Sequence, residues 1–197
     1  MKKTYLFFIF NLFTLTIFGQ NINVEEFQKQ IAESGLQFEM PVGYKIKEVK
    51  KNRDLQYSFA IINTEGTMEV RYSIFPMKQM LIEYEKSKND PNVTMINPNK
   101  LYIGIMQSNG LNMTNGKMVD IGDFPTFAVK KEFNADYGGN AFFEFNCEFG
   151  KGYKYGQFVC LHKENLADVI ITFMSNDRYT HSDLMEIPFH ALTFKLN

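Results

Sequence analysis

The chain has 197 residues, of which 45% are hydrophobic and 15% aromatic, and its formal net charge is −1 at pH 7. That length suits a single domain with a sizeable core. Because 21 Lys and Arg residues nearly balance 22 Asp and Glu residues, no basic excess is available for a polyanion, and nucleic acid is not an expected partner.

Residues 1–19 have the composition of a secretory signal peptide. Lys2 and Lys3 precede an apolar run, and the small residue Gly19 follows it. The alternative is a membrane anchor, but this run is shorter than the roughly 20 apolar residues that span a bilayer, and no later stretch is long enough either. We therefore expect cleavage after Gly19, a secreted or periplasmic location, and a single α+β domain over residues 20–197.

The mature chain opens with a predicted helix over residues 23–34. Val24, Phe27 and Ile31 recur at helical spacing, and Gly35 supplies a stop. Because its apolar residues form one stripe, this helix is expected to pack on another element. Alternating apolar and polar residues then predict a strand over residues 36–40.

A β-hairpin is predicted over residues 57–74. Its two strands are separated by the turn sequence NTEG. In the second strand the even positions are apolar, and the odd positions hold the polar residues Glu69, Arg71 and Ser73. This alternation predicts a hairpin with one dry face and one face in water.

The rest of the chain contains two predicted helices, a run of strands and a closing helix. The helices cover residues 77–88 and 97–110, and Gly110 is expected to stop the second. Pro188 bends or ends the C-terminal helix. The strands are predicted over 117–122, 126–133, 140–149, 155–162 and 167–175, the last buried on both faces. This order indicates an α+β fold in which an antiparallel β-sheet is flanked by helices.

The opening strand and turn resemble a known family. Phe38, Pro41, Gly43 and Tyr44 stand where PsbP-like domains carry the pattern F-x-x-P-x-G-(W/Y). The order of elements over most of residues 24–197 is also similar to that family. The resemblance implies an α/β/α sandwich that acts as a binding or assembly module, and it implies no catalytic residues.

Cys147 and Cys160 are the only two cysteines and flank a glycine-rich turn. Export favours oxidation, and a turn centred on residues 153–154 would place them opposite each other as a disulfide. A turn over residues 150–153 would instead set them about 13 Å apart along one strand face, which is too far for a bond. Buried free thiols are the alternative. A three-ligand zinc shell of Cys147, Cys160 and His162 is a third interpretation, although nothing else in the hairpin supplies a second shell.

Sequence signatures of catalysis are missing. The chain contains no G-x-S-x-G, no H-E-x-x-H, no C-x-x-C and no phosphate-binding glycine loop. We interpret His162, His181 and His190 as structural residues. No catalytic residue, metal ligand or cofactor is therefore assigned.

Two loops rich in Gly, Tyr and Asn are candidate contact loops. Tyr137, Tyr153 and Tyr155 lie on them and could offer aromatic surface to a partner. We therefore expect a binding or accessory module that recognises an envelope or secreted protein. The alternatives are a small-ligand carrier with a cavity between helices and sheet, and a metal-dependent hydrolase.

Overall fold

The computed structural model describes residues 14–196, with side chains from residue 24 onward. Residues 1–13 of the predicted signal peptide lie outside this range, so the signal peptide stays a prediction. Helix α1 (Thr14–Glu33) begins inside residues 1–19, the predicted signal peptide. It ends just before Gly35, where φ is +63°. None of the helices in residues 14–196 combines the length and apolar character that a membrane crossing requires.

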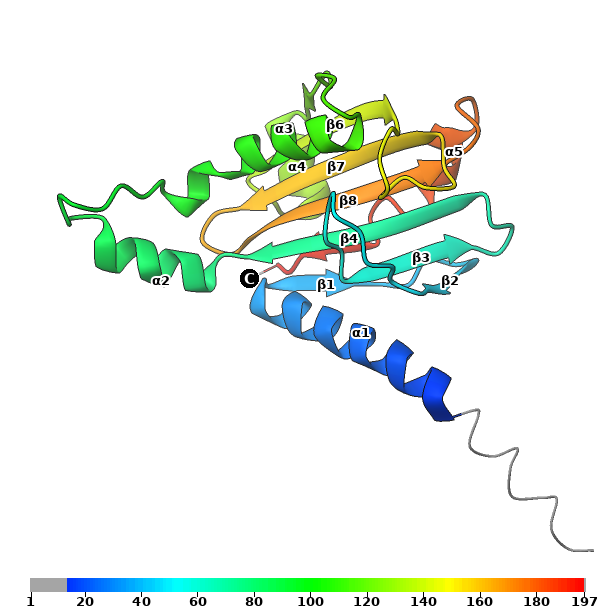
Figure 1. Cartoon of the computed structure of the whole chain (residues 1–197), viewed down its shortest axis with the longest axis horizontal. Helices are drawn as coiled ribbons and strands as arrows, with labels where there is room; N and C mark the ends of the chain where they lie inside the picture. The colour runs from blue at the N-terminus through cyan, green and yellow to red at the C-terminus, as the bar shows by residue number, and fades with distance from the viewer. Residues whose placement is uncertain (1–13, 197) are drawn as a thin grey trace, which may run out of the picture.

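A seven-stranded antiparallel sheet dominates the fold, in the order β2-β3-β4-β8-β7-β6-β5 (Figure 1). A separate two-stranded sheet joins β1 to β9, the two ends of the domain. The strand bounds are Leu36–Phe38 for β1, Tyr44–Lys47 for β2, Phe59–Asn63 for β3, Met68–Pro76 for β4, Gly122–Asp123 for β5, Tyr137–Glu144 for β6, Tyr155–Lys163 for β7, Ala167–Ser175 for β8 and Leu192–Phe194 for β9. The predicted fold class, α+β with an antiparallel sheet flanked by helices, is confirmed.

Strand β8 lies at the centre of the large sheet. Its nine residues are all buried, and it pairs along its whole length with β4 on one side and β7 on the other. The run Val169, Ile170 and Ile171 therefore supplies apolar side chains to both faces, as the sequence predicts.

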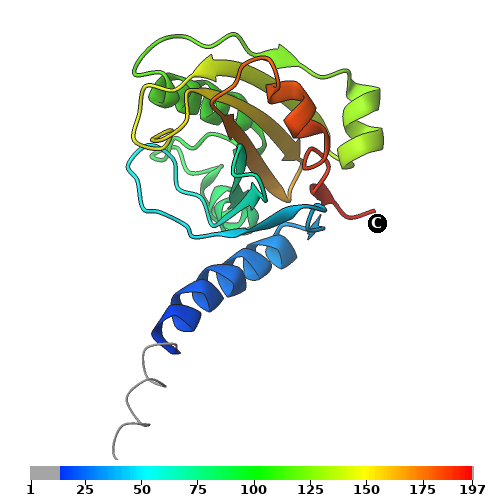
Figure 2. The same cartoon turned by 90° about the vertical axis from the view of Figure 1, so that its right-hand side faces the viewer.

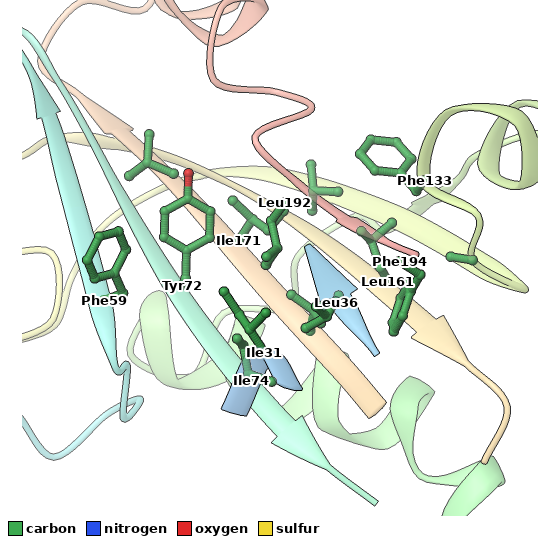
Figure 3. Packing of buried hydrophobic residues seen from close by; sticks show 14 of the residues in the cluster. Ile31, Leu36, Phe59, Tyr72, Ile74, Phe133, Leu161, Ile171, Leu192 and Phe194 are labelled. Atoms are coloured by element: carbon green, nitrogen blue, oxygen red, sulfur yellow. The ribbon is translucent and has the colours of Figure 1, made fainter. Parts of the chain in front are cut away.

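One face of the sheet packs against α1, α4 (Thr126–Phe133), α5 (His181–Glu186) and the small sheet (Figure 2). Figure 3 shows side chains of α1, α4 and the small sheet meeting those of the large sheet in this core. Phe27 of α1 stacks on Phe59 of β3, with ring centroids 4.1 Å apart. The predicted apolar stripe of the first helix is thereby buried.

The opposite face packs against α3 (Tyr102–Met113) and two loops, residues 49–57 and 145–153. Helix α2 (Lys78–Ser87) extends past the end of the sheet, where it has no buried residue (Figure 1). A connection over residues 88–97 follows α2, and a short 3-10 helix, η1 (Pro98–Lys100), then leads into α3.

Residues 126–133 form a helix, whereas the sequence predicts a strand. Val129 and Phe133 lie one turn apart and are buried, while Phe127 is 77% exposed. In a strand, Phe127, Val129 and Phe133 would all point to the same face. In the helix, only Val129 and Phe133 face the sheet, and Phe127 points to solvent. Of the strand predicted over residues 117–122, only Gly122 lies in a strand, the two-residue β5 that it forms with Asp123.

Helix α3 continues past Gly110, which the sequence predicts as its stop. A Cβ atom at this position would lie 2.3 Å from Val119 Cγ2 and 3.6 Å from Phe158 Cζ. The glycine therefore serves close packing between the helix, the following loop and the sheet.

The prediction that the β3–β4 hairpin has one wet face is wrong. Glu69, Arg71 and Ser73 of β4 are 1%, 6% and 2% exposed. The two loops over residues 49–57 and 145–153 cover this part of the sheet, which a local alternation of residues cannot reveal.

Candidate binding groove

An open groove lies on the α4–α5 face of the sheet and divides into two hollows on either side of Phe189. The hollow beside α4 has a volume of about 200 Å³ and is lined by Phe124, Pro125, Ala128, Val129, Glu132, Phe133 and Phe189. The hollow beside α5 has a volume of about 220 Å³ and is lined by Gln157, Ser182, Met185, Glu186, Phe189 and His190. The segment after α5 contacts α4, through Phe189 against Phe133 and His190 against Glu132.

Phe189 forms a fixed ridge between the hollows. Its ring centroid lies 5.4 Å from that of Phe133, 6.1 Å from that of Phe173 and 6.3 Å from that of Phe124. These aromatic contacts come from α4, β8 and the segment before α4. Because three elements hold the ring, both hollows are formed before anything binds.

The rim of the groove combines ionic and exposed apolar groups. His190 Nε2 lies 3.1 Å from Glu132 Oε2, so one side-chain hydrogen bond connects the segment after α5 to α4. Phe127 is 77% exposed and Ile187 is 63% exposed beside the two helices. An apolar floor with polar groups at the edge is typical of binding sites.

A second polar cluster lies on the other face of the sheet, beneath the two covering loops. Glu69 Oε1 accepts a hydrogen bond of 2.6 Å from Arg71 Nε, and Glu69 Oε2 accepts one of 2.8 Å from Tyr153 OH. Lys47 Nζ also donates to Glu69 Oε2. Burial raises the pKa of the Glu69 carboxyl, but Arg71, Lys47 and Tyr153 outweigh it and hold that pKa below its usual value.

Arg71 connects this cluster to both loops. Its guanidinium lies 4.7 Å from the Tyr57 ring centroid and 4.6 Å from that of Phe149, and it donates to the Phe149 carbonyl. The Phe149 amide in turn donates to Asp54 Oδ2 over 2.7 Å. Every charge in the cluster has a partner within the chain, so we interpret the cluster as a clamp that holds the loops in place.

The three tyrosines of the candidate contact loops do not form one site. Tyr153 lies in the loop over residues 145–154 and is bound to Glu69, and burial together with Glu69 raises its pKa. Tyr155 begins β7 and stacks on Phe142. Tyr137 begins β6 at the opposite end of the β6–β7 hairpin, where its hydroxyl donates to Asp123 over 2.6 Å. Their role as contact residues stays a prediction.

Of the interpretations left open for the cysteines, the disulfide is wrong: both are free thiols, with Cys160 buried and Cys147 partly buried. Cys160 lies opposite Gly139 in the β6–β7 register, while Cys147 lies in the ten-residue connection and contacts Met113. A turn does form over residues 150–153, where the Tyr153 amide donates to the Gly150 carbonyl over 2.9 Å. The strands beyond it pair in neither predicted register, since Gly156 lies opposite Phe143. Phe145 folds back over Gly156, where a Cβ atom would lie 2.5 Å from the Phe145 ring, and this opens the connection into a wide loop.

Burial raises the pKa of both thiols, that of Cys160 well above its ordinary value. A protonated, buried thiol is a weak nucleophile and a poor metal ligand. We therefore interpret both cysteines as structural.

The three histidines occupy three separate pairs. His162 Nδ1 lies 2.7 Å from Asp168 Oδ1, and His181 Nδ1 lies 2.7 Å from Ser175 Oγ. His190 faces Glu132 at the groove rim. Among residues 14–196, no group of three or more His, Cys, Asp or Glu side chains is arranged to hold a metal ion. The zinc shell of Cys147, Cys160 and His162 considered from the sequence is therefore not assembled.

The groove residues were missed by the sequence analysis. The four-residue spacing of Val129 and Phe133 fits one turn of a helix. On such a helix, Ala128 and Glu132 lie on the flank next to its buried side. No local signal places Phe189 beside them. No family model matches the sequence, and no curated protein matches it at a significant level.

Proposed function

We propose that this chain is a secreted or periplasmic binding module of the PsbP-like kind, and that its α4–α5 groove receives two apolar side chains from an exported protein. The pair of hollows on either side of Phe189 carries this proposal. The predicted signal peptide supports the location, and the F-x-x-P-x-G-Y pattern supports the family.

The size of the hollows favours a protein segment over a small ligand. Small-molecule sites enclose about 300–1,000 Å³, whereas the hollows measure about 220 and 200 Å³ and are separated by a ring. Each is suited to one large apolar side chain. A carrier would need a single larger and more enclosed cavity, so the carrier hypothesis has less support.

A hydrolase would need converging reactive groups. His190 is the one histidine that lines the groove, and its imidazole is paired with Glu132 at the rim. His162 and His181 are buried in other pairs. The geometry therefore supports recognition better than acid–base or metal-assisted hydrolysis.

Site-specific photo-cross-linking tests the proposal. In one variant a photoreactive amino acid replaces Ser182, which lines the hollow beside α5. In the control variant it replaces Ser108, an exposed residue of α3. Expressed in the native cell, the Ser182 probe is expected to label one defined peptide with two large apolar side chains. Gln157→Trp fills the same hollow and should abolish that adduct.

The proposal fails if Ser182 and Ser108 give the same adducts, or if Gln157→Trp leaves the Ser182 adduct unchanged. Circular dichroism of each variant checks that the fold is retained. Mass spectrometry of the purified mature protein tests the location as well, because an uncleaved N-terminus would contradict the signal peptide.

A further inference from the structure

We propose that the groove is occupied by a second copy of this chain, in a two-fold symmetric dimer in which Phe127 of each copy enters the α5 hollow of the other. This inference rests on the proposed function, since it names the partner for that same groove.

The projecting part of the interface is on α4. Phe127 is 77% exposed and therefore stands out from the surface as a large aromatic side chain. Lys131 lies one turn further along the helix and shares its outward face. Exposed aromatic rings of this kind act as anchors when they enter a hollow on a partner.

The receiving part is the hollow of about 220 Å³ beside α5. Its walls include Met185, Phe189 and the aliphatic part of Gln157, and Ser182 and Glu186 stand at its mouth. The hollow therefore offers an apolar interior with an acidic group at the edge. A phenyl ring followed by a lysine matches it in both size and sign of charge.

The charges of the two helices are complementary. Helix α4 carries exposed Lys130, Lys131 and Glu132, one more positive than negative charge, and α5 carries exposed Asp183 and Glu186. Lys130 is paired with Asp136, but the ion pairs within residues 24–196 include neither Lys131 nor Glu186. When α4 of one copy lies against α5 of another, Lys131 meets Glu186.

Knob and hollow lie on the same face, so the contact can be reciprocal. Helices α4 and α5 cover the same face of the sheet (Figure 2), and Phe189 lines both hollows. A two-fold axis between the helices brings each α4 to the partner's α5 and forms the same contact twice. Such self-complementary patches are the usual basis of closed dimers.

Sedimentation velocity of the mature protein over a wide concentration range tests the dimer. We expect a monomer–dimer equilibrium, and Phe127→Ala should raise the dissociation constant about 10- to 100-fold, as loss of an aromatic anchor does. Ile96→Ala is the matched control, because Ile96 is 65% exposed in the connection between α2 and η1, which lines neither hollow. It should leave the dissociation constant unchanged.

A charge swap tests the arrangement of the two copies. Lys131→Glu and Glu186→Lys should each weaken the dimer, and the double variant should restore it. All three positions changed on this face are exposed, so the variants should keep the melting temperature of the parent protein.

A parent protein that is monomeric at every concentration overturns the inference, as does a Phe127→Ala variant that dimerises normally. Failure of the charge swap, or growth into ever larger species, overturns the two-fold arrangement. If the protein is monomeric yet the Ser182 probe labels a different protein through the groove, only this inference fails. If Ser182 gives no groove-dependent adduct at all, the proposed function fails with it.

Discussion

Gly110 provides the sharpest test of how α3 packs on the sheet. A methyl group at this position would lie 2.3 Å from Val119 Cγ2. Overpacking of this kind costs about 1–3 kcal/mol. Replacing a helical glycine by alanine contributes at most about 1 kcal/mol in the other direction. Gly110→Ala should therefore destabilise the protein by about 1 kcal/mol.

Gly104→Ala isolates the packing contribution. Gly104 lies in the same helix, and a Cβ atom there would meet nothing within 4 Å. Its alanine variant should be neutral or more stable by up to about 1 kcal/mol. The difference between the two variants then measures the collision with Val119.

Urea unfolding of the parent protein and both variants, followed by circular dichroism, gives the three free energies of unfolding. If Gly110→Ala is as stable as Gly104→Ala, then α3 does not approach the loop as closely as described. A large loss of stability in Gly104→Ala would also refute the packing argument, because no atom lies close enough to a Cβ at this position to explain it.

Three further outcomes follow from buried groups. Glu69→Gln should cost about 3 kcal/mol at pH 7, because removing one charge leaves buried Arg71 without its partner. The Glu69 pKa is lowered in the folded state, so its stabilisation is present above pH 4.5 and is lost as the pH falls below that; urea unfolding should show the variant and the parent converging in acid. Desolvation lowers the His181 pKa to about 4, so NMR should find its imidazole neutral at pH 5.5, and stability should fall as the pH drops from 6.5 towards 4. Iodoacetamide should leave Cys160 unlabelled in the folded protein but label it in urea, and a reducing agent should not change the melting temperature, since both thiols are free.

The elements that the sequence predicts correctly are those whose apolar residues recur at the period of the structure they form. The three consecutive apolar residues from Val169 onward mark β8 as central, because only a strand buried on both faces needs apolar side chains at successive positions. The stripe of Val24, Phe27 and Ile31 identifies the first helix in the same way. In both cases the period of the pattern and the environment agree.

Elements that depend on distant partners are not predictable in this manner. Glu69 alternates with apolar neighbours and reads as a solvent-facing residue. It is buried because Lys47 and Tyr153, 22 and 84 positions away, supply its hydrogen bonds. Segment 126–133 is short enough that two apolar residues fit either a helix or a strand, and only the packing of Val129 and Phe133 on the sheet decides between them.

The groove follows from a mismatch in length between helices and strands. Helices α4 and α5 have eight and six residues, so they are about 12 and 9 Å long. Strands β7 and β8 have nine residues each and extend about 30 Å. Two such short helices cannot cover these strands by themselves, and α1 and the small sheet cover another part of the same face. Phe189, placed by the chain that leaves α5 at Pro188, fills only the middle of the gap and leaves a hollow on each side. Lengthening α5 by one turn would close the hollow beside it, so the binding site exists because that helix ends early.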